Sequence, residues 1–568
     1  MAFDNNEQSN NRNFIIAIVL FMAVMFGYSY FFNERKPEAE ETKKTEESRA
    51  LPLKNEETTR KEISVKDAVS KDSRVSIENS HMTGSIDLNG GIIDEVVLKD
   101  YKQTTEKDSE SVMLLTPRNT FSEFFYEILY NDKTNNEALS EKTVWVAENF
   151  EGNRQKVTLK TQTQNGIIIE RTISLDDGYL INITDKIINV SDKNVKISAN
   201  SNLVRTNPQV NNYAVVHEGL VGNAYEKIEE IKYKDVEGET KLSKSDWFGY
   251  ADIYWLCSVI NKDKDSFVSY SKISGESFKI STNTKNDIDV APDSVAELNY
   301  LLFTGPKDIG ILKGYGDQLN LYKFDMAIDF GWFFMITKPL IYFMDVLAKV
   351  FSNMGLVVLI LTLLFKVLTY PLVKKSFKSV AKMKEMRPKI SNLQKLYAHD
   401  KMRMNQELMA LYKKEQISPM SGCLPMLLQA PIFFCLYKVF FVSIQMRHAP
   451  LFGWIQDLSA PDRLYVFNLF GLIDWTPPSF LQIGVWPLIM GLSMFLQQKL
   501  TTSSDKNAEK TSEQRMQENM MLILPIMFTY ICSSFPVAVV IYWTISNIIS
   551  MVQQYFTNKS LEREKENR

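Results

Sequence analysis

Hydrophobic residues are distributed unevenly along this chain of 568 residues. Residues 14–32 form an apolar run of about 19 residues, long enough to cross a bilayer and longer than the core of a signal peptide. The run ends in Tyr-Ser-Tyr-Phe-Phe-Asn without a small-residue cleavage site, so we expect residues 1–32 to be a short stub and an uncleaved membrane anchor. Residues 33–74 are rich in Glu, Lys, Thr and Ser with almost no aromatics, which predicts a flexible charged tether.

The pattern changes at residue 75. Over residues 75–325, β-branched and polar residues alternate in short stretches, with little helical spacing. Turn-forming residues separate several of these stretches, which is typical of antiparallel hairpins. We therefore predict an all-β antiparallel sandwich. The turns are Asn89-Gly90-Gly91, Asn165-Gly166, Asp177-Gly178 and Asp192-Lys193-Asn194.

A segment of mixed character follows at residues 326–351. It is aromatic on one side and carries Lys338, Pro339, Asp345 and Lys349. We expect an amphipathic helix lying on the membrane surface, and a further membrane span is the alternative.

Four more segments are apolar enough to supply membrane spans. The last is apolar for about 34 residues, too long for one crossing, and Ser533-Ser534-Phe535-Pro536 interrupts it near the middle. We expect two helices joined by a turn there, which gives six spans with the anchor and predicts a polytopic α-helical membrane protein. The four segments are residues 352–373, 421–446, 480–498 and the hairpin 519–555.

Loop charges predict the orientation of the spans. Residues 374–420 carry twelve Lys and Arg against four Asp and Glu, whereas residues 447–479 carry two arginines. Because basic loops stay in the cytoplasm, the first loop is expected inside and the second outside. Counting crossings then puts the β domain outside, and the N-terminus, the loop 499–518 and the tail 556–568 inside. The flanks of the anchor do not support this orientation, which depends on the large basic loop.

The large basic loop is patterned as two amphipathic helices. Apolar residues recur at spacings of three and four on both sides of a break at His399-Asp400, and Asp400 is a suitable N-cap. We expect an αα-hairpin that is kinked or restarted at Pro388. Its methionines suit adaptable apolar binding, although packing of the hairpin against itself also explains them. They are Met383, Met386, Met402, Met404 and Met409.

One charge, Lys366, lies inside the apolar run 354–373. An ammonium near the centre of a span costs about 2.5–3.5 kcal/mol on insertion scales. The cytoplasmic border at Lys374-Lys375 is about 12 Å away, and a lysine stem covers only part of that distance. We predict that Lys366 faces a water-filled cavity open to the cytoplasm, which makes it a candidate functional site. Lys438 lies close enough to the outer interface to reach it, and we interpret it as structural.

Neutral polar residues in the spans favour the same cavity. Each one alone is explained by a hydrogen bond between helices, but several of them in a bundle that also holds Lys366 favour a hydrophilic interior. These residues are Thr362, Gln429, Ser443, Thr544, Ser546 and Asn547.

Composition and motifs argue against other classes of protein. The formal net charge of −3 gives no basic excess for binding DNA, and no zinc spacing or RNA-binding signature is present. Of four cysteines only Cys257 lies in the polar half, so no disulfide framework is available there. The sequence has no hydrolase, metalloprotease, phosphate-loop or dinucleotide motif. We therefore expect no enzyme, no cofactor and no metal site.

Four stretches of the second half are specific in combination. They are "LTLLFKVLTYPLVKKSFKSVAKMKEMRPKI", "ISPMSGCLPMLLQAPIFFCLYKVF", "APLFGWIQDLSAPD" and "FPVAVVIYWTISNIISMVQQ". In this order they resemble the second span with its cytoplasmic hairpin, the third span, the next outer loop and the last span of the YidC/Oxa family of membrane protein insertases. The resemblance is close over about residues 330–556. The anchor, tether and β domain resemble the Gram-negative form of the family by architecture.

The resemblance implies an insertase of the bacterial inner membrane with a periplasmic β domain and a five-helix core. Such a protein passes apolar segments of nascent membrane proteins into lipid through a groove open to the cytoplasm. Lys366 falls at the position of the groove cation, where arginine is usual, and lysine is the more hydrated and more easily deprotonated of the two. Thr362, Gln429, Tyr542 and Trp543 fall at groove-lining positions, and Trp543 replaces a common tyrosine.

Partners and one rival function stay open at this point. The resemblance implies nascent membrane proteins and lipids as partners, and the sequence does not decide whether a Sec-type translocon or the ribosome takes part. The rival is a solute or ion transporter with Lys366 as the counter-ion of its substrate, for which we would expect an internal repeat between span pairs and detect none. The β domain could also hold a glycan or a partner protein. Residues 467–486 look longer than in compact members of the family, and the sequence assigns them no role.

Overall fold

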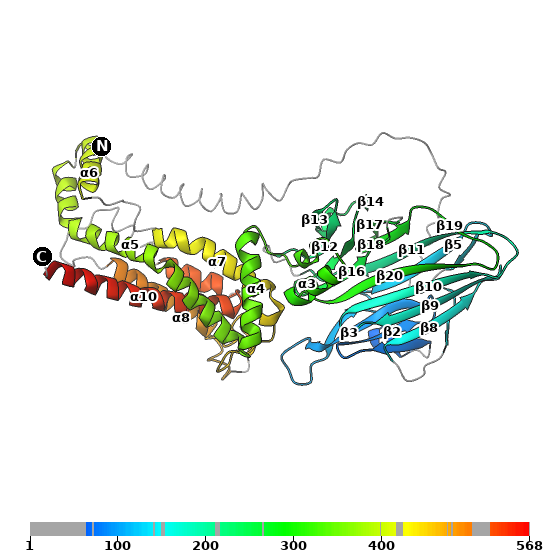
Figure 1. The fold of residues 1–568 in the computed structure, drawn as a ribbon. Coiled ribbons are helices and arrows are strands. Elements are labelled where there is room, and N and C mark those ends of the chain that lie inside the picture. Colours follow the sequence, from blue (N-terminus) through cyan, green and yellow to red (C-terminus); the bar gives the residue numbers. More distant parts are fainter. Residues whose placement is uncertain are drawn as a thin grey trace, which may run out of the picture. The chain divides into compact units, whose positions relative to one another are not determined.

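The computed structural model describes residues 64–70, 73–139, 142–148, 154–210, 216–242, 244–263, 266–397, 399–415, 424–473, 475–478, 481–502 and 523–566. The predicted anchor at residues 14–32 and the tether up to residue 63 lie outside these ranges. After the short helix α2 (Val65–Val69), the described chain is mainly β-structure as far as Pro306 and mainly helical from Ile309 onward (Figure 1).

The β region consists of two antiparallel sheets, with eleven and nine strands among the described residues. The first sheet contains β1 (Arg74–Glu78), β2 (Met82–Asp87), β3 (Ile92–Lys102), β4 (Ser111–Leu115), β5 (Phe124–Asp132), β6 (Glu137–Leu139), β11 (Val195–Thr206), β14 (Glu239–Leu242), β17 (Ser266–Ser274), β18 (Ser277–Thr284) and β19 (Ile288–Val290). The second contains β7 (Val146–Glu148), β8 (Lys156–Gln162), β9 (Ile167–Leu175), β10 (Leu180–Asn189), β12 (Gly219–Ala224), β13 (Lys227–Ile231), β15 (Trp247–Ala251), β16 (Trp255–Ile260) and β20 (Val295–Pro306).

The strands follow the alternation in the sequence. Along β9 every second side chain is buried, which places its isoleucines at positions 167, 169 and 173 in the shared core. The four predicted turns connect β2 to β3, β8 to β9, β9 to β10 and β10 to β11. In the β8–β9 turn Gly166 has a φ of 81°, which glycine adopts without strain. The predicted antiparallel sandwich is confirmed.

A buried ion pair lies in the core of this sandwich, between two neighbouring strands of one sheet. Arg171 on β9 lies directly opposite Asp185 on β10, and its guanidinium donates to the two carboxylate oxygens at 2.9 and 2.7 Å. Both side chains are fully buried. The Tyr130 hydroxyl also donates to Asp185 at 2.5 Å, and Arg171 lies over the Trp145 ring, 4.6 Å from its centroid. These partners offset the cost of removing both charges from water.

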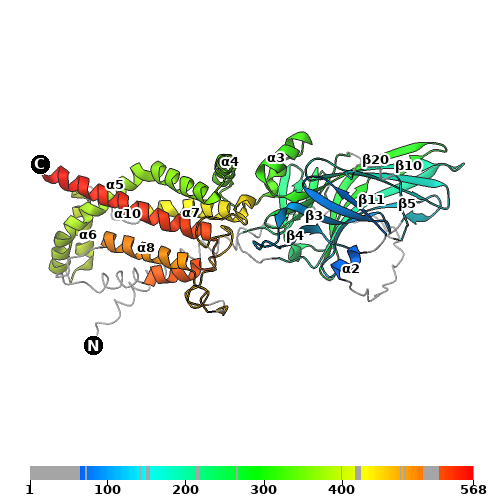
Figure 2. The same cartoon turned by 90° about the horizontal axis from the view of Figure 1, so that it is seen from below.

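The second half of the chain is helical. Its helices are α3 (Ile309–Gln318), α4 (Phe334–Val350), α5 (Met354–Leu396), α6 (Lys401–Lys414), α7 (Leu424–Val442), α8 (Val485–Thr502), the segment Ile523–Cys532 and α10 (Val537–Glu566). Figures 1 and 2 show α5, α7, α8 and α10 lying side by side, and α10 makes extensive contacts with both α5 and α8.

The predicted separate hairpin over residues 374–420 is wrong in one respect. Its first helix does not start anew after the membrane span, because α5 runs unbroken for 43 residues through Pro371 and Pro388. A proline removes one hydrogen bond from a helix but already has helical φ, so neighbouring turns can carry the helix across it. The second helix begins where predicted: Asp400 caps α6 by accepting from the Arg403 backbone N–H at 3.0 Å.

The described helices supply fewer clear membrane spans than the sequence predicts. Among the described residues, Met354–Met383 and Val537–Arg563 are long and apolar enough to cross a membrane, and Gln429–Val442 and Ile523–Cys532 are shorter apolar helices. The interruption predicted at Ser533-Ser534-Phe535-Pro536 is present, since helix stops at Cys532 and resumes at Val537. The last helix extends beyond the predicted end of its span, to Glu566.

The segment predicted to be an amphipathic helix, residues 326–351, contains helix α4. It buries one face, which includes Leu340 and Met344, while apolar residues such as Met335 and Val346 are exposed on the other. Its charges are paired. Lys338 contacts Asp325 at 2.5 Å, and Lys349 contacts Asp345 at 2.8 Å. An exposed apolar face beside paired charges suits a helix in the membrane interface.

Another ion pair ties α7 to the segment that precedes α4. The buried Lys438 ammonium contacts Asp329 at 2.6 Å, and Asp329 also accepts from the backbone N–H groups of His217 and Gly331 at 2.7 and 2.9 Å. Burial tends to raise the pKa of Asp329, but Lys438 and these hydrogen bonds outweigh it and hold the pKa below its usual value. The structural interpretation of Lys438 fits this arrangement.

Removing the arginine of the core ion pair should destabilise the sandwich strongly. In Arg171→Met the Asp185 carboxylate stays buried without its cation, so we expect a loss of about 3–5 kcal/mol in the free energy of unfolding. Urea unfolding of the detergent-solubilised chain, followed by tryptophan fluorescence, measures this loss. Arg154→Met is the control, because Arg154 pairs with Glu78 at the exposed surface and should cost less than about 1 kcal/mol. Equal effects of the two substitutions would contradict the assigned role of Arg171.

The stability of the folded chain should depend on His217 in acid. The His217 ring is buried and its Nε2 lies 2.9 Å from the Leu220 carbonyl oxygen. Burial lowers the pKa of His217 from 6.5 to about 4. Between these values the unfolded chain takes up a proton that the folded chain does not, so stability falls as the pH falls.

The expected loss is about 2 kcal/mol between pH 6.5 and pH 5, from about 1.4 kcal/mol per pH unit. Urea unfolding at both pH values checks it. His217→Gln keeps a donor for the Leu220 carbonyl and should lose about this much less stability over the same range. An unchanged pH dependence in His217→Gln would show that other groups are responsible.

Candidate functional site

The inward face of α5 carries the predicted cation. Lys366 is 8% exposed, and its ammonium donates to the Ser550 hydroxyl of α10 at 2.8 Å. Thr362, one turn earlier on the same face, is buried and donates to the Val358 carbonyl of its own helix at 2.7 Å. The intervening leucines at 363 and 364 are exposed on the opposite side. This i, i+4 placement separates a polar stripe on the inside from an apolar surface on the outside.

Facing Lys366, α10 presents a stripe of polar residues at helical spacing. Most are buried, and several contact polar groups of neighbouring helices. Gln553 donates to the Lys366 carbonyl at 3.4 Å, and its own side-chain oxygen is buried without a hydrogen-bond partner in the part of the chain that the structure describes. Such an oxygen indicates a position where water or a bound polar group can be accepted. The stripe consists of Tyr542, Ser546, Ser550, Gln553, Gln554 and Thr557.

The stripe reaches α7 through Gln429. The Gln429 amide donates to the Tyr542 hydroxyl at 2.5 Å and lies 3.5 Å from the Ser546 hydroxyl. Next to Tyr542, Trp543 packs against Phe433 of α7 and Phe528, with ring centroids 4.7 and 5.0 Å apart. The structure therefore brings Gln429 and Tyr542 into direct contact, and it places Trp543 in an aromatic cluster beside them.

On another side of α10 the bundle holds a separate polar contact. Asn547 donates to the Ser493 hydroxyl of α8 at 3.0 Å, and both residues are buried. The side chains of two predicted cavity residues make no hydrogen bond to Lys366, Gln429 or the polar stripe of α10. Thr544 and Ser443 each donate to a carbonyl of their own helix, at 2.8 and 2.6 Å.

The ammonium of Lys366 has no carboxylate beside it in the part of the chain that the structure describes. Its hydrogen-bond partner is a hydroxyl, and no carboxylate of the described residues lies within ion-pairing distance of the ammonium. An ammonium without a counter-ion in a membrane bundle attracts water and anions. The arrangement therefore suits the capture of a carboxylate. Nowhere in the described ranges are three or more His, Cys, Asp or Glu grouped to hold a metal ion.

The predicted methionines of the cytoplasmic loop divide into two groups. Met386 on α5 is buried and Met383 is partly buried, so these two pack against the protein. On α6, Met402 and Met409 are exposed, and Met404 is intermediate. Of these five methionines, Met402 and Met409 are thus the exposed ones.

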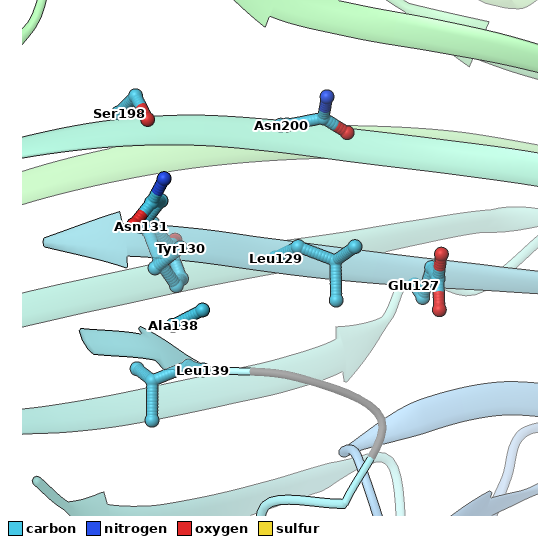
Figure 3. A pocket seen from close by; sticks show the side chains of 8 residues that line it. All are labelled: Glu127, Leu129, Tyr130, Asn131, Ala138, Leu139, Ser198 and Asn200. Atoms are coloured by element: carbon cyan, nitrogen blue, oxygen red, sulfur yellow. The ribbon is translucent and has the colours of Figure 1, made fainter. Parts of the chain in front are cut away.

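Outside the helical region, one hollow lies on the β domain (Figure 3). It has a volume of about 440 Å³ and is lined by residues of β5, β6 and β11, including Glu127, Asn131 and Asn200. Some of its polar side chains bond to residues outside the lining: Asn200 donates to Asn283 at 2.7 Å, and Glu127 accepts from Asn202 at 3.0 Å. No chemistry-bearing group of the sequence analysis lies in it.

The sequence analysis missed Ser550 and Gln553, the two α10 residues nearest Lys366. A signal for them was present, because residues 542, 546, 550, 553, 554 and 557 repeat at spacings of three and four. Both residues lie within the predicted hairpin 519–555, and of the stripe only Thr557 falls beyond its predicted end.

Comparisons with known proteins agree with this architecture. The family model described as "60Kd inner membrane protein" matches residues 346–565, and the model described as "YidC periplasmic domain" matches residues 74–343. The proteins named "Membrane protein insertase YidC" of Rickettsia prowazekii (strain Madrid E) and Rickettsia rickettsii (strain Iowa) are 38% and 37% identical to this chain, over 97% of it and 99% of their own length.

A solved structure described as an active YidC insertase, with its first transmembrane domain resolved, covers 86% of this chain and 92% of its own. It is 16% identical with a TM-score of 0.35, too low a similarity to support an argument. Family membership rests on the two family models and on the full-length relatives. The chain belongs to the YidC family of membrane protein insertases.

Proposed function

We propose that this chain inserts apolar segments of nascent membrane proteins into the bacterial inner membrane, with the cluster around Lys366 as the hydrophilic groove of the transfer path. One observation carries the proposal. The buried Lys366 ammonium is bonded to a hydroxyl and has no carboxylate at ion-pairing distance among the described residues, so its charge stays available to a client. The family names of the relatives agree with this function.

Charge capture is the first step of the mechanism. An acidic residue in the short outer tail of a client costs about as much at the bilayer centre as a lysine does, roughly 2.5–3.5 kcal/mol. Lys366 attracts such a carboxylate, and the polar stripe with its unsatisfied Gln553 oxygen accepts the water that accompanies it. The cost of bringing the tail into the membrane is thereby reduced.

Release into lipid is the second step. The client's apolar segment leaves the polar stripe past the aromatic cluster of Trp543, Phe433 and Phe528. Transfer of apolar surface from water into lipid is favourable and needs no nucleotide. Tyr542, Gln429 and Thr362 line the path without offering a charge that would hold the client.

The exposed methionines of α6 are the proposed first contact with a client. Met402 and Met409 offer flexible apolar surface on the helix that follows α5. In this proposal the full chain has six spans with a five-helix core, both termini in the cytoplasm and the β domain in the periplasm. Membrane lipids, the ribosome and a Sec-type translocon are the proposed further partners.

Reversing the charge of the groove should abolish insertion of acidic-tailed clients. The purified chain is reconstituted alone in liposomes, a two-span client with acidic outer residues is synthesised beside it, and protease protection of the outer loop is scored. Lys366→Glu should reduce protection about tenfold or more, as expected if capture contributes at least about 1.4 kcal/mol.

One variant and one altered client control this assay. Lys366→Arg keeps the cation and should retain protection, and a client with neutral outer residues should be inserted equally by all forms. Normal insertion of the acidic client by Lys366→Glu would refute charge capture. No protection with the unaltered chain would point to a required translocon or return the transporter function to consideration.

Stability should separate the two buried lysines. Lys366→Met removes a buried charge that has no carboxylate partner among the described residues, so it should leave stability unchanged or raise it. Lys438→Met leaves Asp329 buried without its cation and should cost about 3 kcal/mol or more. Thermal unfolding in detergent compares them. Equal destabilisation by the two substitutions would make Lys366 a structural residue.

A further inference from the structure

The loop between α7 and α8 ends in a tip covered with large apolar side chains. Leu472 is 85% exposed, and the other large apolar residues of the tip are between 47% and 52% exposed. Single exposed hydrophobic residues are ordinary on protein surfaces, but a contiguous group of this size marks a contact surface. The tip consists of Phe467, Leu469, Phe470, Leu472, Ile473 and Trp475.

The backbone holds these side chains outward in a defined conformation. Leu469, Phe470 and Gly471 all have positive φ, at 49°, 61° and 86°, which is unusual for two bulky residues in succession. Asn468 braces the turn, because its side-chain oxygen accepts from the Gly471 N–H at 3.0 Å and its carbonyl accepts from the Ile473 N–H at 3.1 Å. Backbone in these regions persists where the surrounding structure fixes it, commonly at functional surfaces.

The base of the loop is fixed to the start of α8. The Leu464 carbonyl accepts from the Val485 N–H at 3.2 Å, and the Asp462 carboxylate accepts from the Trp486 N–H at 2.8 Å. Asp462 also accepts from the Trp454 ring N–H at 3.0 Å. The tip therefore keeps a set place beside the first turn of α8, a helix whose Leu488 and Leu492 are themselves exposed.

We propose that this tip inserts into the outer leaflet of the bilayer and anchors the outer end of α8 at the lipid headgroup boundary. Asp474 is the one charged residue among residues 464–475, so the tip has few of the charges that usually steer a protein partner. It does contain amphipathic aromatics, Trp475 on the tip and Tyr465 at its base, which favour the membrane interface. The base of the loop is bonded to the first turn of α8, a helix with exposed leucines, so in this proposal one lipid phase covers both.

Nitroxide accessibility tests this placement directly. Cys423 is replaced by Ser, while the buried Cys257, Cys435 and Cys532 stay. A spin label is placed at Leu472→Cys in the full chain reconstituted in liposomes, and relaxation by oxygen is compared with relaxation by a water-soluble nickel chelate. The matched control is Phe121→Cys on the β domain, where the native side chain is 61% exposed.

We expect the label at 472 to be relaxed by oxygen and several-fold less by the nickel chelate than the label at 121. A label at Phe467→Cys, nearer the base, should lie at a shallower depth. Strong relaxation by the nickel chelate at 472, equal to that at 121, would place the tip in water and overturn the proposal. Protection from both reagents would place the tip in a protein contact and overturn it equally. Insertion of clients is not needed for the readout, so the result is independent of the proposed groove.

Discussion

The helical half of the molecule is organised around the cost of burying one ammonium. Lys366 cannot lie in a dry apolar bundle, because an unsolvated cation is too unstable there. The helices meet this constraint with hydroxyl and amide groups. Ser550 of α10 accepts from the ammonium, and the polar stripe of α10 reaches Gln429 of α7 through Tyr542. The interior of the bundle is consequently polar where α10 faces α5 and α7.

The two buried lysines of this chain show how the partner decides the role. Lys438 lies against the Asp329 carboxylate, which also accepts two backbone N–H groups. The charge of Lys438 is therefore neutralised by an ion pair. Lys366 lies against a hydroxyl, which stabilises a cation without cancelling its field. The first arrangement fastens α7 to the segment before α4, and the second leaves Lys366 without a carboxylate partner among the described residues.

Short-range sequence patterns predicted much of the fold, but they did not predict contacts between segments that are distant in the sequence. The turns at Asn165-Gly166 and Asp177-Gly178 and the break after Cys532 are short-range signals and were predicted correctly. At Pro388 the sequence left a kinked and a restarted helix as alternatives, because a proline pattern does not distinguish them, and α5 continues through it. The Arg171–Asp185 pair was accessible in part, since both residues lie seven positions from Gly178, but their burial depends on the opposite sheet.

The unbroken α5 has a mechanical consequence for the site. A helix of 43 residues is about 65 Å long, roughly twice the thickness of the hydrocarbon core. The same helix therefore carries Lys366 in the bundle and ends beside α6, where Met402 and Met409 are exposed. Along the chain, α5 is thus the connection between Lys366 and α6. Pro371 and Pro388 lie between the two, and each removes a hydrogen bond, so bending is concentrated there.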